Sequence, residues 1–86
     1  MSSILTLDDL REILIVAAGD DDDVDLDRDI LDVTFEELGF DSLALLETVT
    51  LVKRRTGVAI GDDELDEIVT PRTLLNKVNN TLADVA

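Results

Sequence analysis

The sequence predicts an all-α fold: a four-helix bundle with three longer helices, one short helix and a long loop after the first helix. Leucine, isoleucine and valine make up 30 of the 86 residues and recur at helical spacing, whereas only two phenylalanines and one proline are present. The hydrophobic fraction of 45% is that of a folded protein rather than of a disordered acidic tail. The length predicts a single domain over residues 1–86 with a modest, mainly aliphatic core.

The first helix is expected over residues 7–18. Thr6 and Asp9 have the spacing of a capping box, and Gly19 offers a C-terminal stop. Five apolar residues of this segment fall on one continuous helical face: Leu7, Leu10, Ile13, Leu14 and Ala17.

An acidic segment follows at residues 19–32, with eight aspartates and one arginine. It therefore carries −7, half of the formal net charge of −14, and is expected to be a long solvated loop. Its scattered apolar residues, which we expect to hold it on the bundle, are Val24, Leu26, Ile30 and Leu31. Farther on, Gly39 indicates a turn and Phe40 a buried plug.

The second helix is expected to begin at Asp41 or Ser42 and to end near Thr56, with Gly57 as its stop. Its predicted core face consists of Leu45, Leu46, Val49 and Val52. A second stripe on the other side consists of Leu43, Ala44, Glu47 and Leu51. The three basic residues at the helix end, Lys53, Arg54 and Arg55, complement the helix dipole and limit which partners dock there.

A short helix is expected over residues 62–68. Thr70 and Pro71 then predict the start of the last helix, with threonine as N-cap and proline at the first helical position. That helix carries the apolar residues Leu74, Leu75, Val78 and Leu82.

The composition excludes several classes of function. Without cysteine or histidine the chain forms no disulfide, no Cys/His zinc site and no Ser-His-Asp triad. A net charge of −14 disfavours nucleic acids and anionic membranes and favours basic protein surfaces as partners. The longest apolar run, six residues, is too short to span a membrane, and no basic signal-peptide start is present, so the cytoplasm is the expected compartment.

Four acidic residues have the spacing of positions 1, 3, 5 and 12 of an EF-hand calcium loop: Asp25, Asp27, Asp29 and Glu36. Ile30 occupies the sixth position, where the loop requires glycine for its sharp turn. We therefore expect no metal site. A small calcium-responsive or scaffolding helical protein remains an alternative of a different class.

Ser42 is the residue most clearly placed for chemistry. A serine in the first turn of a helix is exposed and lies beside free backbone N–H groups that stabilise a phosphate. It has no internal base, so it suits the role of acceptor for a group that another enzyme transfers, and Asp41 beside it could position the hydroxyl or a metal ion. The alternative is a plain helix-cap serine.

The run Gly39-Phe40-Asp41-Ser42-Leu43 resembles the Asp-Ser-Leu attachment motif of acyl carrier proteins. The resemblance covers nearly the whole chain. It implies that Ser42 receives 4′-phosphopantetheine from coenzyme A, with Asp41 and Leu43 as the flanking motif residues. The arm would hold acyl groups as thioesters on its terminal thiol.

Two runs resemble the carriers of type II polyketide synthases: Asp41-Ser42-Leu43-Ala44-Leu45-Leu46-Glu47-Thr48 and Thr70-Pro71-Arg72-Thr73-Leu74-Leu75. Fatty acid carriers usually have an acidic residue where this chain has Ala44, and peptidyl carriers usually have glycine where it has Phe40. Gly61 departs from the family, in which proline is common, and puts the start of the short helix in doubt. A fatty acid or peptidyl carrier remains the alternative.

The resemblance implies a monomeric, non-catalytic carrier of malonyl groups and growing polyketide intermediates. Its implied partners are a phosphopantetheinyl transferase, a malonyl acyltransferase, a ketosynthase/chain-length-factor pair and a ketoreductase. The stripe of Leu43, Ala44, Glu47 and Leu51 is the candidate docking face, although single surface leucines are common. Arg72 is a candidate contact for a bound intermediate or, more simply, a surface arginine paired with an aspartate.

Overall fold

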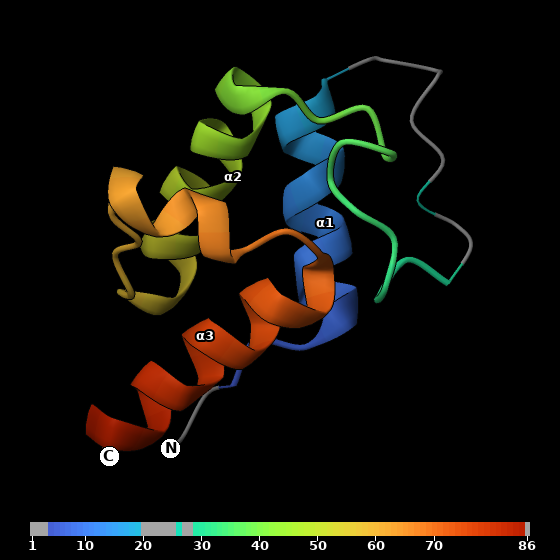
Figure 1. Ribbon diagram of the computed structural model, residues 1–86. Helices are drawn as coiled ribbons and strands as arrows, with labels where there is room; N and C mark the ends of the chain where they lie inside the picture. Colours follow the sequence, from blue (N-terminus) through green and yellow to red (C-terminus); the bar gives the residue numbers. More distant parts are fainter. Residues whose placement is uncertain (1–3, 20–25, 27–28, 86) are drawn as a thin grey trace.

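Three α-helices and one 3-10 helix make up the regular structure of the described part of the chain in this computed structural model (Figure 1). The structure describes residues 4–19, 26 and 29–85. The helices are α1 (Leu7–Ala18), α2 (Ser42–Thr56), a 3-10 helix (Asp62–Glu67) and α3 (Pro71–Val85). α1 packs on both α2 and α3. The predicted all-α fold is confirmed, and the expected short helix is a 3-10 helix that ends one residue earlier than predicted.

The helix ends are set by the caps that the sequence indicates. The Thr6 hydroxyl accepts the Asp9 N–H at 3.1 Å, and the Asp9 carboxylate accepts the Thr6 N–H at 3.2 Å. The bond from the Thr6 N–H stabilises the charged carboxylate and so holds the pKa of Asp9 below its ordinary value of 3.8. Gly57 ends α2 with a φ of 83°, a left-handed conformation that favours glycine.

The hydrophobic core is one cluster, to which every helix and the loop before α2 contribute side chains. It confirms the predicted face of α1, in which Leu10, Ile13 and Leu14 are buried and Leu7 and Ala17 half-buried. Its other buried members are Leu5, Leu26, Ile30, Phe35, Leu38, Phe40, Val49, Val52, Val58, Ile60, Ile68, Leu74, Leu75 and Val78.

The predicted core face of α2 is wrong at Leu46, whose side chain is 37% exposed. Thr48 is fully buried instead. Thr48 is four positions before the buried Val52 and therefore lies only about 40° from it around the helix axis. Leu46 is six positions before Val52 and lies about 120° from it, away from the core. The Thr48 hydroxyl donates to the Ala44 carbonyl at 2.9 Å, so its burial leaves no unpaired donor.

Two backbone hydrogen bonds connect the segment between α1 and α2 to the start of α3. The Phe35 N–H donates to the Val69 carbonyl at 2.9 Å, and the Arg72 N–H donates to the Leu31 carbonyl at 3.0 Å. Leu26 and Ile30 are buried as expected, Leu31 is half-buried, and Val24 lies outside the described residues.

Polar contacts link the elements at the surface. Arg55 on α2 reaches two carboxylates of α1, Asp9 at 3.0 Å and Glu12 at 3.2 Å. Lys77 on α3 pairs with Glu64 at 3.5 Å and Glu67 at 3.4 Å, which ties the 3-10 helix to α3. Such exposed pairs contribute little individually, so the aliphatic core supplies most of the stability.

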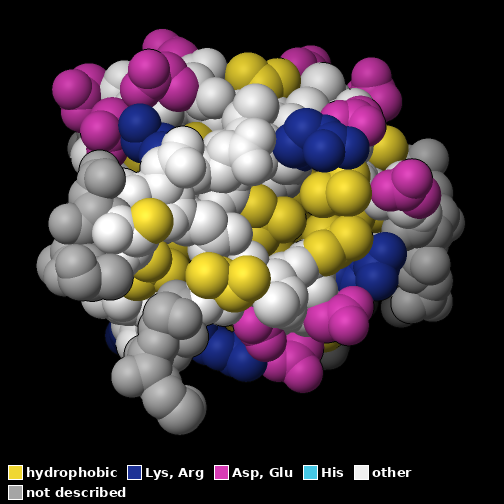
Figure 2. Space-filling view, turned by 90° about the horizontal axis from the view of Figure 1, so that it is seen from below, with side chains coloured by type: hydrophobic (Ala, Val, Ile, Leu, Met, Phe, Trp, Pro, Cys, Tyr) yellow, Lys and Arg dark blue, Asp and Glu magenta, His cyan; other side chains and the backbone are white. Residues whose placement is uncertain are grey.

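The N-terminal segment is held by one side chain of α3. Asn79 accepts the Leu5 N–H at 2.7 Å and donates to the Leu5 carbonyl at 3.0 Å. Figure 2 shows one face of the molecule, on which hydrophobic side chains gather at the centre with acidic and basic side chains around them. Apolar surface is therefore exposed among charges of both signs despite the excess of acidic residues.

Candidate functional site

Ser42 is the first residue of α2 and is exposed, as predicted. Asp41 is the N-cap residue, and its carboxylate accepts the Ala44 N–H at 2.8 Å. The Asp41 carbonyl accepts the Leu45 N–H at 2.9 Å. Asp41 therefore fixes the start of the helix, and through it the position of the Ser42 hydroxyl.

A tight turn immediately precedes the start of α2. The Phe40 N–H donates to the Phe35 carbonyl at 2.8 Å, and Gly39 adopts a φ of 89°. The two phenylalanine rings meet edge to face, with centroids 6.1 Å apart. Phe40 is the buried plug that the sequence predicts, and it anchors the residues immediately before Ser42.

The helix start has the donors that a phosphate requires. Among the described residues, the N–H groups of Ser42 and Leu43 have no hydrogen-bond acceptor. Such groups at a helix N-terminus stabilise an anion. Asp41, Glu36 and Asp66 also line the cavity beside this helix start, so the site combines free N–H donors with acidic side chains and has no net positive charge.

A cavity of about 430 Å³ opens beside Ser42, between the turn before α2 and the segment around the 3-10 helix. Its polar edge includes Ser42, Asp41 and Asp66. The apolar side chains that line it are Phe35, Phe40, Leu45, Leu65, Ile68 and Val69. It is a depression open to solvent, with apolar walls and an acidic edge.

The predicted docking stripe divides into two parts. Leu43, directly after Ser42, is 75% exposed, and Glu47 farther along α2 is also exposed, so both are accessible. Ala44 and Leu51 are half-buried and pack against the core, so they offer less surface. The structure therefore exposes Leu43 and Glu47 on the first half of α2, whereas Leu51 lines a groove against α1.

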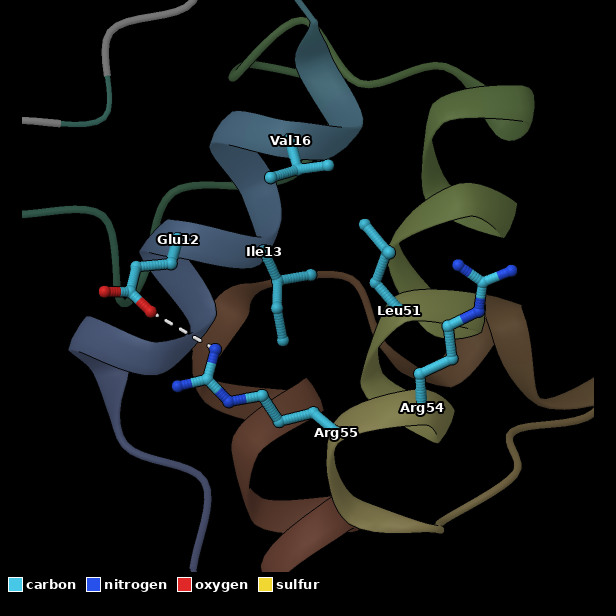
Figure 3. Close-up of a pocket in the computed structure, with 6 residues that line it drawn as sticks. All are labelled: Glu12, Ile13, Val16, Leu51, Arg54 and Arg55. Atoms are coloured by element: carbon cyan, nitrogen blue, oxygen red, sulfur yellow. Dashed lines mark hydrogen bonds and ion pairs between the residues drawn. The ribbon is translucent and has the colours of Figure 1, made fainter.

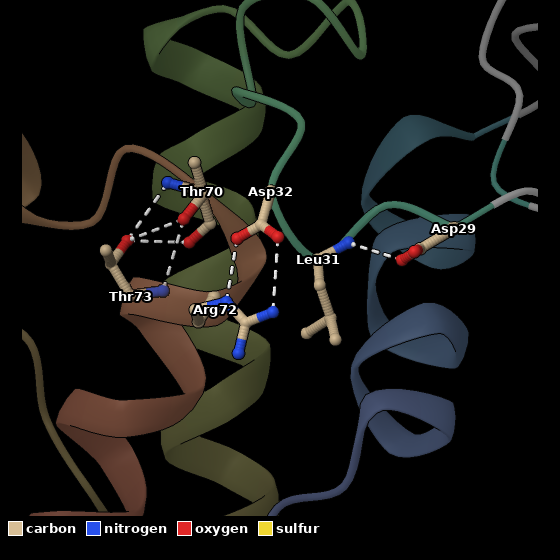
Figure 4. A network of polar contacts seen from close by, with 6 residues as sticks. All are labelled: Asp29, Leu31, Asp32, Thr70, Arg72 and Thr73. Atoms are coloured by element: carbon tan, nitrogen blue, oxygen red, sulfur yellow. Dashed lines mark hydrogen bonds and ion pairs between the residues drawn. The ribbon is translucent and has the colours of Figure 1, made fainter.

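Arg72 forms a two-pronged ion pair with Asp32 in the loop (Figure 4). Its Nε and one Nη donate to the two carboxylate oxygens at 2.7 and 3.2 Å. This hydrogen-bonded partner lowers the pKa of Asp32 below its ordinary value of 3.8. The simpler of the two interpretations of Arg72 describes this geometry, since its guanidinium is engaged by the loop.

Two of the four candidate calcium ligands, Asp25 and Asp27, lie outside the described residues. Asp29 accepts the Leu31 N–H at 3.3 Å, and Glu36 borders the cavity beside Ser42. No group of three or more acidic side chains in the described ranges is arranged to hold a metal ion. Within those ranges there is also no helix of the length and apolarity that a membrane crossing requires.

The family described as "phosphopantetheine attachment site" matches residues 8–78. The chain therefore belongs to this family of carrier domains, whose cofactor is covalently attached 4′-phosphopantetheine. The exposed hydroxyl of Ser42, with free N–H groups beside it and a cavity next to it, fits that group.

Within the family, the chain is similar to polyketide synthase carriers. It is 56% identical to the granaticin polyketide synthase acyl carrier protein of Streptomyces violaceoruber over 82 residues, which are 95% of this chain and 96% of the relative. It is 48% identical to the actinorhodin carrier of Streptomyces coelicolor over the full length of both chains. These relatives make the protein a member of the type II polyketide synthase acyl carrier proteins, which carry acyl intermediates on phosphopantetheine.

Solved structures agree. The octanoyl form of the actinorhodin carrier superimposes with a TM-score of 0.91, and the holo form with 0.84, each at 48% identity and full coverage of both chains. The polyketide resemblance is thereby confirmed, and the fatty acid, peptidyl and scaffolding alternatives are not favoured.

Proposed function

We propose that Ser42 is the attachment residue, and that the protein carries malonyl groups and growing polyketide chains between enzymes of a polyketide synthase. The observation that carries this proposal is the exposed Ser42 hydroxyl at the start of α2, beside unpaired N–H groups and an apolar cavity. Asp41 caps the helix and holds the hydroxyl in place, and Leu43 flanks it at the surface. When bound, the arm supplies a thiol that holds acyl groups as thioesters.

The residues around Ser42 bind and position rather than catalyse. The chain contains no histidine to act as a base, and the nearest carboxylate, that of Asp41, is engaged by the Ala44 N–H. Partner enzymes therefore supply the chemistry. Because the cavity has apolar walls next to Ser42, it can shelter part of a carried chain from water. We propose that Arg72 contacts a bound intermediate only where Asp32 releases it.

The proposed partners are a phosphopantetheinyl transferase, a malonyl acyltransferase, a ketosynthase/chain-length-factor pair and a ketoreductase, all in the cytoplasm. They would dock on Leu43 and Glu47 beside Ser42, with a smaller contribution from Ala44 and Leu51. The net charge of −14 favours a monomer, formed from the single domain of residues 1–86, and basic docking surfaces on the enzymes. Binding should therefore be brief and weakened by salt.

Intact mass spectrometry tests the attachment. The protein is incubated with coenzyme A and a broad-specificity phosphopantetheinyl transferase, beside a Ser42→Ala variant. We expect the parent to gain one phosphopantetheine and the variant none. A folded parent that gains nothing would contradict the proposal. Supplying a malonyl donor or an aminoacyl donor with its loading enzyme then separates a polyketide from a peptidyl carrier, and we expect only malonyl to be loaded.

A further inference from the structure

A groove between α1 and α2 lies away from the attachment site, toward the C-terminal end of α2 (Figure 3). Its volume is about 430 Å³. It is lined by Glu12, Ile13 and Val16 from α1 and by Leu51, Arg54 and Arg55 from α2. Ser42 and Arg54 are twelve residues apart on one helix, which corresponds to roughly 18 Å along its axis. The groove is therefore a separate feature of the helix that begins at Ser42.

The walls of the groove are apolar and partly open to solvent. Val16 is 64% exposed, whereas Ile13 beneath it is buried and Leu51 opposite is half-buried. In Figure 3 these three side chains occupy the space between the two helices. A partner side chain placed there would cover apolar surface that the fold itself leaves exposed.

Two arginines contribute positive charge to the rim of the groove, and they differ in their ion pairs. Arg55 is paired with Asp9 and Glu12 across the helices. Arg54 makes no ion pair with any residue that the structure describes, although the chain contains 21 acidic residues. An unpaired cation beside an exposed apolar wall is complementary to a partner group that is both apolar and acidic.

We propose that this groove receives an acidic segment of a polyketide synthase enzyme that docks along α2. An apolar side chain of the segment contacts Val16 and Leu51, and a neighbouring carboxylate pairs with Arg54. The inference rests on the proposed function, because the enzyme is one that docks to reach Ser42. A second copy of this chain is a poor occupant, since two molecules of charge −14 repel each other.

The two ends of α2 would then present opposite charges to the enzyme. Asp41 and Glu47 lie toward the Ser42 end, and Arg54 lies at the groove end. An enzyme that contacts both ends needs basic residues opposite the first and acidic residues opposite the second. The reversed orientation would juxtapose like charges, so the groove makes the helix bind in one direction.

Two pairs of matched variants test the groove. Val16→Ser is compared with Ile15→Ser, because Ile15 is also a β-branched residue of α1, is 55% exposed, and does not line the groove. Arg54→Gln is compared with Lys53→Gln, because Lys53 is an exposed cation one position away that does not line it either. Circular dichroism melting first confirms that all four variants are folded.

Dissociation constants are measured by calorimetry against the ketosynthase/chain-length-factor pair, the malonyl acyltransferase and the ketoreductase. We expect Val16→Ser and Arg54→Gln each to weaken binding to at least one enzyme about fivefold or more, with both controls within about twofold of the parent. Equal effects of variant and control, or no effect with any enzyme, would overturn the inference. So would a dimer of the parent in sedimentation that Val16→Ser abolishes.

The attachment assay distinguishes this failure from failure of the proposed function. If the groove has no role but Ser42 is the attachment residue, Arg54→Gln binds every enzyme as the parent does and still gains one phosphopantetheine. If the parent gains no phosphopantetheine, the proposed function has failed, and with it the inference.

Discussion

Replacing Asn79 with alanine tests the contact that holds the N-terminal segment on α3. The Asn79 amide makes two hydrogen bonds to the main chain of Leu5, at 2.7 and 3.0 Å, and the Leu5 side chain is only 2% exposed. A neutral hydrogen bond contributes about 1 kcal/mol net, so loss of the pair should cost about 2 kcal/mol. Alanine has a higher helix propensity than asparagine, by about 0.5 kcal/mol, which offsets part of that loss.

Asn80→Ala is the matched control, because Asn80 is the next residue of α3, is exposed, and makes no side-chain hydrogen bond within the described ranges. It gains the same helix propensity without losing a contact. We expect Asn79→Ala to unfold in urea with a free energy about 2 kcal/mol below that of Asn80→Ala, and with a melting temperature roughly 8–16 °C lower. Unfolding free energies that agree within about 0.5 kcal/mol would refute the reasoning.

Three further predictions concern charge and turn geometry. Because Arg72 lowers the pKa of Asp32 below 3.8, the stabilisation from the pair is present above that pH and is lost as the pH falls through the folded-state pKa. Asp32→Asn should therefore be less stable than the parent at pH 7 in urea unfolding, with a gap that closes under acid; a gap that persists there would contradict this. Self-repulsion at −14 predicts a melting temperature that rises from low to moderate salt in a calorimetric scan, and a flat or falling trend would count against it. Gly39 has a φ of 89°, so Gly39→Ala should cost about 1–2 kcal/mol in denaturant unfolding and slow loading of Ser42, whereas an unchanged midpoint would contradict the strain argument.

Most of the fold is predictable from the sequence, because its helix ends depend on local chemistry. The Thr6 and Asp9 pair, the Asp41 cap, Gly57 and Thr70-Pro71 act within a few residues of one another, so sequence spacing reveals them. The 3-10 form of the short helix is different. There Glu64 accepts the Gly61 N–H, a contact that follows from the backbone path rather than from an apolar period.

What the sequence does not predict depends on tertiary packing. Leu46 is exposed and Thr48 is buried, contrary to the predicted core face of α2. The angle at which α2 packs on its neighbours decides which side of the helix is buried. Threonine can be buried in a helix because its hydroxyl donates to the carbonyl four residues earlier. That property is the one sequence feature that indicates Thr48 as a core residue. The Asn79 contact joins positions 74 residues apart, and no local pattern indicates it.

The site shows the same division. Ser42 and Asp41 are found from the sequence because a motif and a helix start coincide there. The cavity beside Ser42 requires the turn before α2 and the segment around the 3-10 helix to meet, and the groove at Arg54 requires α1 and α2 to lie side by side. Neither follows from spacing along the chain.

The most direct test of the account is to locate the modification by fragmentation mass spectrometry. The protein is treated with coenzyme A, a phosphopantetheinyl transferase and a malonyl donor with its acyltransferase, and is then fragmented. Three serines are present, Ser2, Ser3 and Ser42, so the fragments separate the candidates. The account predicts one malonyl-phosphopantetheine, entirely on the fragment that contains Ser42. Modification at Ser2, Ser3 or a threonine, or a folded protein that stays unmodified, would contradict it.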